Sequence, residues 1–548
     1  MRARYALGLD FGTESARALL VDADSGEVAA TAVFAYPDGV IDRRLPGGGP
    51  DLPADWALQN PDDWTAALES LVPRVLGDAG ADASQVVGLG VDFTSCTILP
   101  TAANGTPLCV LDAFRALPHA WPKLWKHHAA QRQADRINAL ARERGEAFVR
   151  RYGNRISSEW LLPKALSVLE ETPDVFDAAV RIIEAADWIV WRLTGNEFRN
   201  ACSAGYKACW EKASGYPSAE FLEALHPGFG RLIADKLAGD VHPPGALAGG
   251  LTEQWAARLG LAPGTPVAAA IIDAHAGALG LGVSEPGVMA MIMGTSTCHM
   301  VMGAEPVLVE GISGVVEDGI LPGLFGYEAG QAGVGDIFAW FVERHVPADL
   351  RDQADRRGIG LHELLTEKAS ALEPGRSGLV SVDWWNGCRT PLVDADLSGA
   401  VVGYTLATGP EEVYRALIEG TAFGTRLVIE TFERQGVPVD RLVATGGLTS
   451  NAMLMRIYAD ATGREIAVAG TQHASALGAA MLGSTAADGG ADLAGAVARM
   501  APEPASTFRP EPIHREVYDQ LYREYVRLVD LFGRGEDSVM KTLKRLRG

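Results

Sequence analysis

A strand–turn–strand pattern occurs near the start of each half of the chain. In the first half, an apolar run over 5–10 leads into Phe11-Gly-Thr-Glu-Ser15, and a second run covers 18–22. In the second half, the apolar runs 288–293 and 298–302 flank Gly294-Thr-Ser-Thr297. Short apolar runs separated by Gly, Ser and Thr predict a hairpin in each half.

A helix and a strand are expected after each hairpin. Apolar residues at helical spacing predict the helices, and Pro73 is expected to kink the first of them. The expected segments are helices 64–76 and 411–434 and strands 85–91 and 441–445. The same order of elements in both halves predicts two related α/β domains, 1–285 and 286–548, although the two stretches barely match as sequences.

Composition excludes several classes of function. The 548 residues include 48 Lys+Arg and 69 Asp+Glu, a formal net charge of −21, which argues against a nucleic-acid binder. Six cysteines without a C-x-x-C pair favour the reducing cytoplasm. The first apolar run is too short for a signal peptide, and the turn residues within the apolar segment 286–304 argue against a membrane span. The basic residues at 541–547 are expected to form a solvated tail.

An acidic chain must hold a phosphate-bearing ligand by something other than bulk positive charge. The common nucleotide signatures G-x-x-x-x-G-K-[ST] and G-x-G-x-x-G are absent. Asp10-Phe11-Gly12 matches the D-F-G of protein kinases, but it lies too early and follows no catalytic loop. The two glycine-containing turns are the remaining candidates for a phosphate site.

Each turn has the chemistry of an anion site. Gly12 lets backbone approach a ligand, so that consecutive N–H groups and hydroxyls point at its oxygens. Asp10, at the end of a buried strand, is a candidate for holding Mg²⁺ through water. Either turn alone is better explained as an ordinary hairpin. The occurrence of one turn in each half favours a phosphate clamp between two domains.

Two further strand ends carry candidate residues. Asp273 follows the apolar run 267–272, and ligands of open α/β sheets bind beyond the carboxyl ends of strands, so Asp273 is a candidate general base. An Asp that merely begins a turn is an equally good explanation. Gly446-Gly447 lies between a strand and a helix, where glycines allow a purine ring to approach, but such turns use glycine routinely.

Together these residues resemble the FGGY family of carbohydrate kinases over nearly the whole chain. The motifs that carry the resemblance are Asp10-x-Gly12-Thr13, Asp187-Trp188 with Leu193-Thr194-Gly195, Asp273-Ala-His-Ala-Gly277, Gly294-Thr-Ser296 and Gly446-Gly447. The resemblance implies an α/β fold of the actin-like ATPase superfamily, in which two ribonuclease-H-like domains flank a catalytic cleft. It also implies ATP and Mg²⁺ as cofactors.

More specific segments resemble the family members that phosphorylate L-ribulose. These segments are 90–97, 123–130, 156–160, 203–208, 326–331 and 383–387. They imply ATP-dependent phosphorylation of L-ribulose at O5 in L-arabinose catabolism. D-ribulose, xylulose and ribitol stay open as alternative substrates, and a non-metabolic actin-like ATPase or a sugar sensor is a more distant alternative. Kinases of this size in the cytosol often form homodimers, and we expect one here.

The resemblance implies roles for individual residues. Asp273 matches the catalytic base and, with Asp10, a position that holds Mg²⁺ through water. The implied sugar-binding residues are Ser95, Trp125, Lys207, Asp273 and Glu328. The implied ATP-binding residues are Asp10, Gly12, Thr13, Gly294, Thr295, Ser296, Gly446, Gly447 and Asn451. Two departures concern Leu448, which stands where many relatives have a third glycine, and Ser95, whose position varies between relatives.

On their own, three of the implied sugar-binding residues have simpler explanations. Lys207 and Glu328 would be surface charges, and Trp125 a core aromatic. As sugar ligands, the two charged residues supply a cationic donor and an anionic acceptor, and the indole stacks on the C–H face of a sugar. The expected reaction has Asp273 accept the proton of O5 while the γ-phosphoryl of ATP moves in line to that oxygen.

Overall fold

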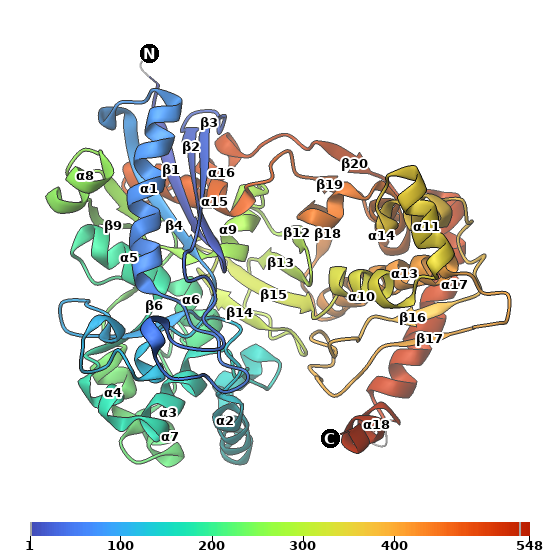
Figure 1. Cartoon of the computed structure of the whole chain (residues 1–548), viewed down its shortest axis with the longest axis horizontal. Helices are drawn as coiled ribbons and strands as arrows, with labels where there is room; N and C mark the ends of the chain where they lie inside the picture. The colour runs from blue at the N-terminus through green and yellow to red at the C-terminus, as the bar shows by residue number, and fades with distance from the viewer. Residues whose placement is uncertain (1–2, 536–538, 548) are drawn as a thin grey trace.

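A computed structural model describes residues 3–535 and 539–547 and contains two large mixed sheets (Figure 1). The first has the order β3-β2-β1-β4-β10-β9, with β11 paired to β4. Its strands are β1 (Tyr5–Phe11), β2 (Ser15–Asp22), β3 (Val28–Ala35), β4 (Val86–Phe93), β9 (Leu247–Gly250), β10 (Pro266–Ala268) and β11 (Ile271–Ile272). The hairpin β1–β2 is antiparallel, whereas β4 runs parallel to β1.

The second sheet has the order β14-β15-β13-β12-β18-β19-β20. Its strands are β12 (Gly287–Met293), β13 (Thr297–Gly303), β14 (Gly314–Glu317), β15 (Phe325–Gln331), β18 (Val439–Thr445), β19 (Ile466–Val468) and β20 (Ser506–Phe508). The pair β12–β13 is antiparallel and β18 runs parallel to β12, which is the arrangement of β1, β2 and β4 in the first sheet. The duplicated order of elements expected from the sequence is therefore present in the fold.

Helices cover both sheets. One face of the first sheet packs on α1 (Pro61–Ala79), α5 (Ala185–Thr194) and α8 (Glu253–Leu259). The second sheet packs on α13 (Pro410–Arg434), α14 (Ala452–Thr462) and α17 (Pro512–Leu528). Between the two sheets lie α9 (Asp273–Gly280) and α15 (Ala474–Ala487), which share one apolar cluster with strands of both sheets (Figure 1).

Small residues let these central helices approach the backbone of their neighbours. A Cβ added to Gly478 would lie 1.9 Å from the carbonyl oxygen of Ala276, and one added to Gly90 would lie 1.8 Å from that of Ala479. Contacts this short exclude any side chain larger than hydrogen. The alanine- and glycine-rich sequence of α15 is therefore required for a helix of the second half to pack on the first sheet.

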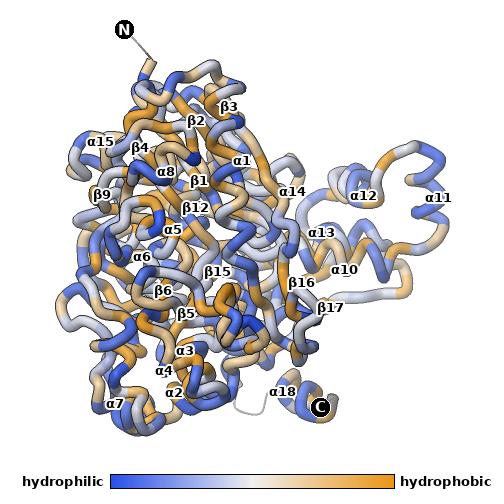
Figure 2. Tube along the Cα trace, turned by 60° about the vertical axis from the view of Figure 1, so that its left-hand side comes forward, coloured by the Kyte–Doolittle hydropathy of each residue, from blue (hydrophilic) through white to orange (hydrophobic). Residues whose placement is uncertain are grey.

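Insertions extend both halves. Below the first sheet, α2 (Gln131–Arg144), α3 (Leu161–Glu171), α4 (Pro173–Ala178) and α7 (Ala219–Leu225) enclose a separate apolar cluster (Figure 1). In the other half, α11 (Ala348–Arg357) and α12 (Leu361–Ser370) protrude from the body as a largely hydrophilic lobe beside α10 (Gly335–His345) (Figure 2). No helix in the described ranges is long and apolar enough to cross a membrane.

Several elements differ from the sequence-based expectation. The helix expected at 64–76 already begins at Pro61, capped by Asn60, and continues through Pro73 because its apolar face is held on the sheet. Asp92 lies within β4 rather than after it. The run 267–272 forms two short strands, β10 and β11, instead of one.

The basic tail is exposed over 542–546, as expected, but it is also ordered and paired. The residues form a helix, α18 (Val539–Arg547), that contacts an acidic loop of the second half. Lys541 Nζ lies 2.7 Å from Asp394 Oδ2, and Lys544 Nζ lies 3.1 Å from Asp396 Oδ1. Charge complementarity with a segment about 150 residues earlier is a tertiary property that the local sequence does not reveal.

Candidate active site

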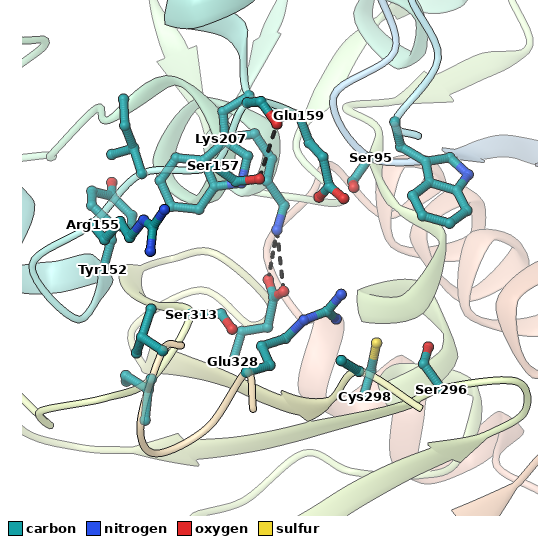
Figure 3. A pocket seen from close by; sticks show the side chains of 18 of the residues that line it. Ser95, Tyr152, Arg155, Ser157, Glu159, Lys207, Ser296, Cys298, Ser313 and Glu328 are labelled. Carbon is teal, nitrogen blue, oxygen red and sulfur yellow. Dashed lines mark hydrogen bonds and ion pairs between the residues drawn. The ribbon is translucent and has the colours of Figure 1, made fainter. Parts of the chain in front are cut away.

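A cavity of about 560 Å³ lies between the two halves of the molecule, a size that suits a small ligand. Both halves contribute to its wall, as Figure 3 shows. The predicted residues that line it are Ser95, Trp125, Lys207, Asp273, Ser296 and Glu328. The predicted residues that do not line it are Asp10, Gly12, Thr13, Gly294, Thr295, Gly446, Gly447 and Asn451. The structure thus brings together the whole predicted sugar site, including segments more than 200 residues apart.

Asp273 stands at the junction of β11 and α9. Ile271 and Ile272 pair with the end of β4, and Asp273 is the first residue of the helix that follows. Its Oδ1 accepts a hydrogen bond of 2.7 Å from the amide of Ala274. Oδ2 accepts no hydrogen bond from the described residues, so this oxygen is available to accept a proton from a ligand in the cavity.

The surroundings of Asp273 raise the pKa of its carboxyl to about 7. Burial is the largest cause and the negative charge of Asp10 the second, while the amide of Ala274 acts in the opposite direction. A carboxylate with a pKa near neutrality is a stronger base than an ordinary aspartate, yet it is still ionised in part at pH 7. This property suits a general base.

Asp92 is a third carboxylate at this point, and the sequence reasoning assigned it no role. In the sheet it pairs with Asp10 on one side and with Ile271, two residues before Asp273, on the other. It is fully buried, and neither carboxylate oxygen has a hydrogen-bond partner in the described structure. Burial, followed by the charges of Asp10 and Asp273, raises its pKa well above the usual range.

These acidic strand ends bear on the expected Mg²⁺. Asp10 is paired with Arg17, whose Nη1 lies 3.0 Å from its Oδ2. Within the described ranges no three Asp, Glu, His or Cys side chains are arranged for direct coordination of a metal. Asp10 lies on β1 and Asp273 directly follows β11, the two strands that flank the end of β4, so both can supply oxygen donors there, and Mg²⁺ usually keeps several of its waters. The residues therefore fit a water-mediated site.

Lys207 and Glu328 form an ion pair across the cavity. Lys207 lies on α6 (Ala201–Ala208) of the first half, and Glu328 on β15 of the second. Lys207 Nζ lies 3.1 and 3.0 Å from the two carboxylate oxygens, and both side chains are largely buried (Figure 3). Burial alone would lower the pKa of Lys207, but the Glu328 carboxylate raises it above the usual value. Lys207 is therefore a charged donor inside the cavity.

Ser95 and Trp125 are held by a lysine that the sequence reasoning missed. Lys164, on α3, is fully buried, and its ammonium donates to the carbonyls of Cys96 at 2.7 Å and Leu124 at 2.8 Å. These carbonyls adjoin Ser95 and Trp125 in the chain. A charged residue within the apolar segment 161–169 is the one sequence signal that could have revealed this role.

The two predicted phosphate turns are the loops between β1 and β2 and between β12 and β13. Gly12 donates its amide to the Ser15 carbonyl at 3.0 Å, and Gly294 donates to Ser296 at 2.9 Å. The backbone N–H groups of Thr13, Glu14, Thr295 and Ser296 have no acceptor among the described residues. Unpaired consecutive amides in a tight turn form an anion-binding nest. The Thr13 hydroxyl also accepts from Trp125 Nε1 at 3.1 Å, which links one turn to the predicted sugar site.

The predicted adenosine residues have structural roles that the structure makes explicit. A Cβ on Gly446 would lie 2.2 Å from the carbonyl oxygen of Met293, so this glycine permits β18 to pass beside β12. Asn451 caps α14 through Leu454 and donates to the Thr366 hydroxyl at 3.1 Å. Gly447 has open space around it, and its backbone remains accessible to a ligand. A nucleotide contact at these three residues stays a prediction.

Comparison with known proteins decides the family. Residues 5–280 match the model of the N-terminal domain of the FGGY family of carbohydrate kinases, and residues 289–487 match that of its C-terminal domain. The chain belongs to the FGGY family of carbohydrate kinases. The resemblance inferred from the motifs is thereby confirmed, and so is the two-domain α/β fold that it implied.

Curated FGGY relatives match along their whole length. A ribulokinase of Geobacillus thermodenitrificans is 51% identical over 549 residues, which cover 99% of this chain and 97% of the relative. A ribulokinase of Mycolicibacterium smegmatis is 49% identical, with 99% and 96% covered. Among solved structures, a xylulose kinase from Rhodospirillum rubrum superimposes with a TM-score of 0.80 at 24% identity and covers 96% of this chain and 98% of its own. This structural likeness shows the fold alone.

Proposed function

We propose that this FGGY kinase is a ribulokinase that transfers the γ-phosphoryl group of ATP to O5 of L-ribulose, forming L-ribulose 5-phosphate and ADP. The observation that carries the proposal is the assembly of Asp273, Lys207 and Glu328 in one cavity of a chain 51% identical to a curated ribulokinase over nearly its full length. Polar groups of both signs fit a neutral polyhydroxylated ligand, and Asp273 fits the abstraction of a hydroxyl proton.

The proposed reaction forms a bond between O5 and the γ-phosphorus and breaks the bond between that phosphorus and the bridging oxygen of ADP. Asp273 accepts the O5 proton on its unoccupied Oδ2. Lys207 and Glu328 orient other oxygens of the sugar, and Trp125 covers an apolar face and excludes water. Positioning of this kind accounts for much of the catalysis of phosphoryl transfer.

The two turns with free amides fit the phosphates of ATP. Amides of Thr13 and Glu14 from one half and of Thr295 and Ser296 from the other would bind phosphoryl oxygens, and Gly446, Gly447 and Asn451 would border the nucleoside. Asp10 and Asp273 would hold Mg²⁺ through its waters. The ion would supply positive charge to the phosphates, which the acidic strand ends do not provide.

Other parts of the proposal concern the setting of the enzyme. We assign the reaction to the cytoplasm and to L-arabinose catabolism, and we expect a homodimer. The division into domains 1–285 and 286–548 is kept as a functional one. The first contributes most of the sugar site, and the second contributes one phosphate turn and the adenosine region.

A panel of ATP-dependent phosphorylation assays tests the substrate. L-ribulose, D-ribulose, L- and D-xylulose and ribitol are compared by kcat/KM, and we expect the highest value for L-ribulose because the sugar contacts reside in fixed, buried polar groups. A higher value for another sugar would assign that substrate instead. If the protein hydrolyses ATP, but no sugar of the panel is phosphorylated or accelerates the hydrolysis, the result would identify the more distant alternative, a non-metabolic ATPase.

A further inference from the structure

Arg389 lines the cavity without an ion-pair partner among the described residues, although its positive charge acts on Glu328 at longer range. Its guanidinium makes no hydrogen bond or ion pair with any residue in 3–535 or 539–547, although it is partly buried. The other cation near the centre of the cavity, Lys207, is neutralised by Glu328. A guanidinium that loses water without gaining an acceptor is unfavourable, so this side chain is suited to an anion supplied by a ligand.

The position of Arg389 is close to the phosphate turn of the second half. A Cβ added to Gly330 would lie 3.4 Å from Arg389 Cδ and 3.5 Å from its Nη1, which is ordinary contact distance, so the arginine side chain lies directly over Gly330. Gly330 pairs with Cys298 on β13, two residues after Ser296. Figure 3 shows Cys298 and Ser296 side by side, with Arg155 at the opposite end of the cavity.

The segment that carries Arg389 is anchored on both sides. Asp383, at its start, accepts hydrogen bonds from Tyr525 OH at 2.8 Å and from Gln331 Nε2 at 2.7 Å. The Thr390 hydroxyl accepts from the amide of Gly330 at 3.2 Å. Cys388 and Asp394 exchange two backbone hydrogen bonds across the loop. Lysines of α18 then hold the far side of the loop through its acidic residues.

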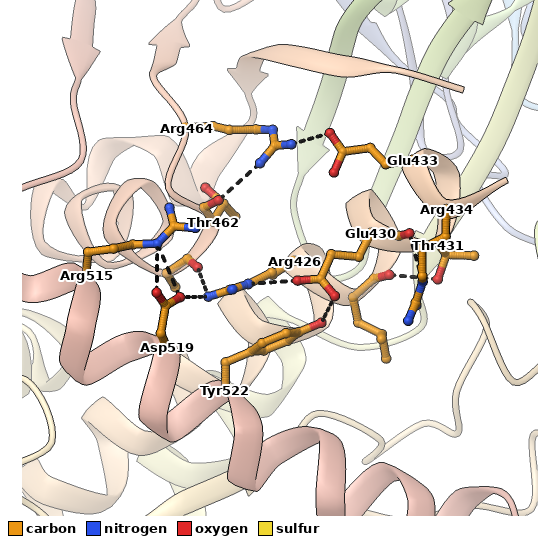
Figure 4. A network of polar contacts seen from close by, with 12 residues as sticks. Arg426, Glu430, Thr431, Glu433, Arg434, Thr462, Arg464, Arg515, Asp519 and Tyr522 are labelled. Atoms are coloured by element: carbon orange, nitrogen blue, oxygen red, sulfur yellow. Dashed lines mark hydrogen bonds and ion pairs between the residues drawn. The ribbon is translucent and has the colours of Figure 1, made fainter. Parts of the chain in front are cut away.

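Tyr525 is itself on a well-fixed helix. Figure 4 shows Arg426 of α13 bound to Glu430 and to Asp519 of α17, and Tyr522 of α17 donating to Glu430. The anchor of the Arg389 loop is thereby continuous with the core of the second half. A loop whose backbone is held in this way needs little ordering when a ligand binds, which favours a precise contact with that ligand.

The charges of the expected ligands indicate which of them Arg389 binds. The sugar is neutral, whereas the group transferred from ATP and the 5-phosphate of the product are both anionic. We propose, on the basis of the proposed function, that Arg389 binds the phosphoryl group as it passes from nucleotide to sugar and holds it in the product. A guanidinium matches two oxygens of a phosphoryl group at once, and here it also offsets part of the negative charge of Glu328.

Binding and turnover of Arg389→Met and Arg389→Lys test this role. Isothermal titration measures the affinity for L-ribulose and, separately, for L-ribulose 5-phosphate. We expect Arg389→Met to lower the affinity for L-ribulose 5-phosphate by about tenfold or more, because a charged hydrogen bond is lost. The affinity for L-ribulose should stay within about twofold of the wild-type value. We also expect kcat to fall by about 10²-fold. Arg389→Lys should restore part of the sugar-phosphate affinity and part of kcat, because lysine keeps the positive charge but lacks the two parallel N–H donors of the guanidinium.

The matched control is Arg155→Met, which removes another arginine of the cavity without an ion pair among the described residues, at the end away from Ser296. It is expected to leave the ratio of the two affinities unchanged. An equal loss of affinity for sugar and sugar phosphate in Arg389→Met would overturn the proposal and make Arg389 a sugar ligand. Unchanged affinities and an unchanged kcat would also overturn it, because Arg389 would then have no role in binding or turnover. An error in the proposed substrate gives a different result, because the wild-type enzyme then phosphorylates another sugar of the panel with a higher kcat/KM. The Arg389 variants are then compared with that sugar and its phosphate.

Discussion

At the scale of single residues, Asp273 illustrates how position creates reactivity. Its carboxyl is an ordinary one, but a short strand and the first turn of α9 place it in a cavity beside Asp10 and Asp92. Burial and like charge raise its pKa to about 7, and the amide of Ala274 occupies only one of its oxygens. The same residue on an exposed loop would be a weak base at neutral pH.

The pH dependence of turnover follows from this shift. Below pH 7 Asp273 is protonated and cannot accept the O5 proton, so kcat/KM for the sugar is expected to rise with pH through about 7 and then level off. Asp273→Asn should lower kcat by about 10²-fold or more and abolish the ascending limb, with sugar affinity largely kept. Near-normal turnover of this variant, or a limb that survives in it, would contradict the assignment of Asp273 as general base.

At the scale of elements, α15 has the most consequential packing. It belongs to the second half of the chain but lies on β1 and β4 of the first, close enough that Gly8, Gly88 and Gly90 cannot carry a Cβ. A Cβ on Gly483 of α15 would in turn meet the backbone of Leu89 at 2.7 Å. The two halves are thereby joined by backbone-to-backbone contact, and the strand ends that carry Asp10 and Asp92 are positioned against this helix.

Gly90→Ala tests that contact. The added methyl would lie 1.8 Å from the carbonyl oxygen of Ala479, so β4 and α15 must separate, and we expect a loss of stability of about 3 kcal/mol. The thermal midpoint measures the effect. Gly77→Ala is the control, since Gly77 is an exposed glycine of α1 with nothing within 4 Å of the added Cβ, and it should raise the midpoint slightly. An unchanged midpoint for Gly90→Ala would show that the helix and sheet can move apart freely.

At the scale of the whole molecule, net charge and ligand charge have the same sign. The chain carries −21, and ATP is also an anion. In the proposed complex the phosphates are bound locally, by amides of two turns, one from each half, that have no acceptor among the described residues, and by Arg389. Local dipoles at contact distance are screened by salt much less than the long-range field of the surface is.

The affinity for ATP is therefore expected to depend strongly on Mg²⁺ and only weakly on salt. Titration calorimetry with ATP, with and without Mg²⁺, between about 50 and 300 mM NaCl measures both effects, and we expect less than about a threefold change with salt. A steep loss of ATP affinity over this range of salt would show that long-range attraction, not the turns, holds the nucleotide. Equal affinity with and without Mg²⁺ would argue against the ion.

Much of this architecture could be predicted from the sequence, for physical reasons that differ from element to element. Strong periodicity located α13 and the hairpins β1–β2 and β12–β13 to within a few residues, because buried faces repeat regularly. The ion pairs of α18 could not be predicted, because its partners, Asp394 and Asp396, are distant in the chain. The roles of Lys164 and Arg389 could not be predicted from the sequence. Lys164 depends on the carbonyls that surround its ammonium, and Arg389 depends on the cavity that it lines.

The sequence by itself determined the local chemistry of this protein: two glycine turns with free amides, an Asp beyond an apolar strand, and motifs diagnostic of a sugar kinase. These depend on residues adjacent in the chain, and short-range backbone geometry is encoded there. Only the tertiary structure decided that Lys207 meets Glu328. It also decided that, within the part of the chain that the structure describes, Asp92 is buried without a hydrogen-bond partner and Arg389 forms no ion pair. Pairing, burial and desolvation are properties of residues far apart in the chain, and they exist only after the two halves have packed around α9 and α15.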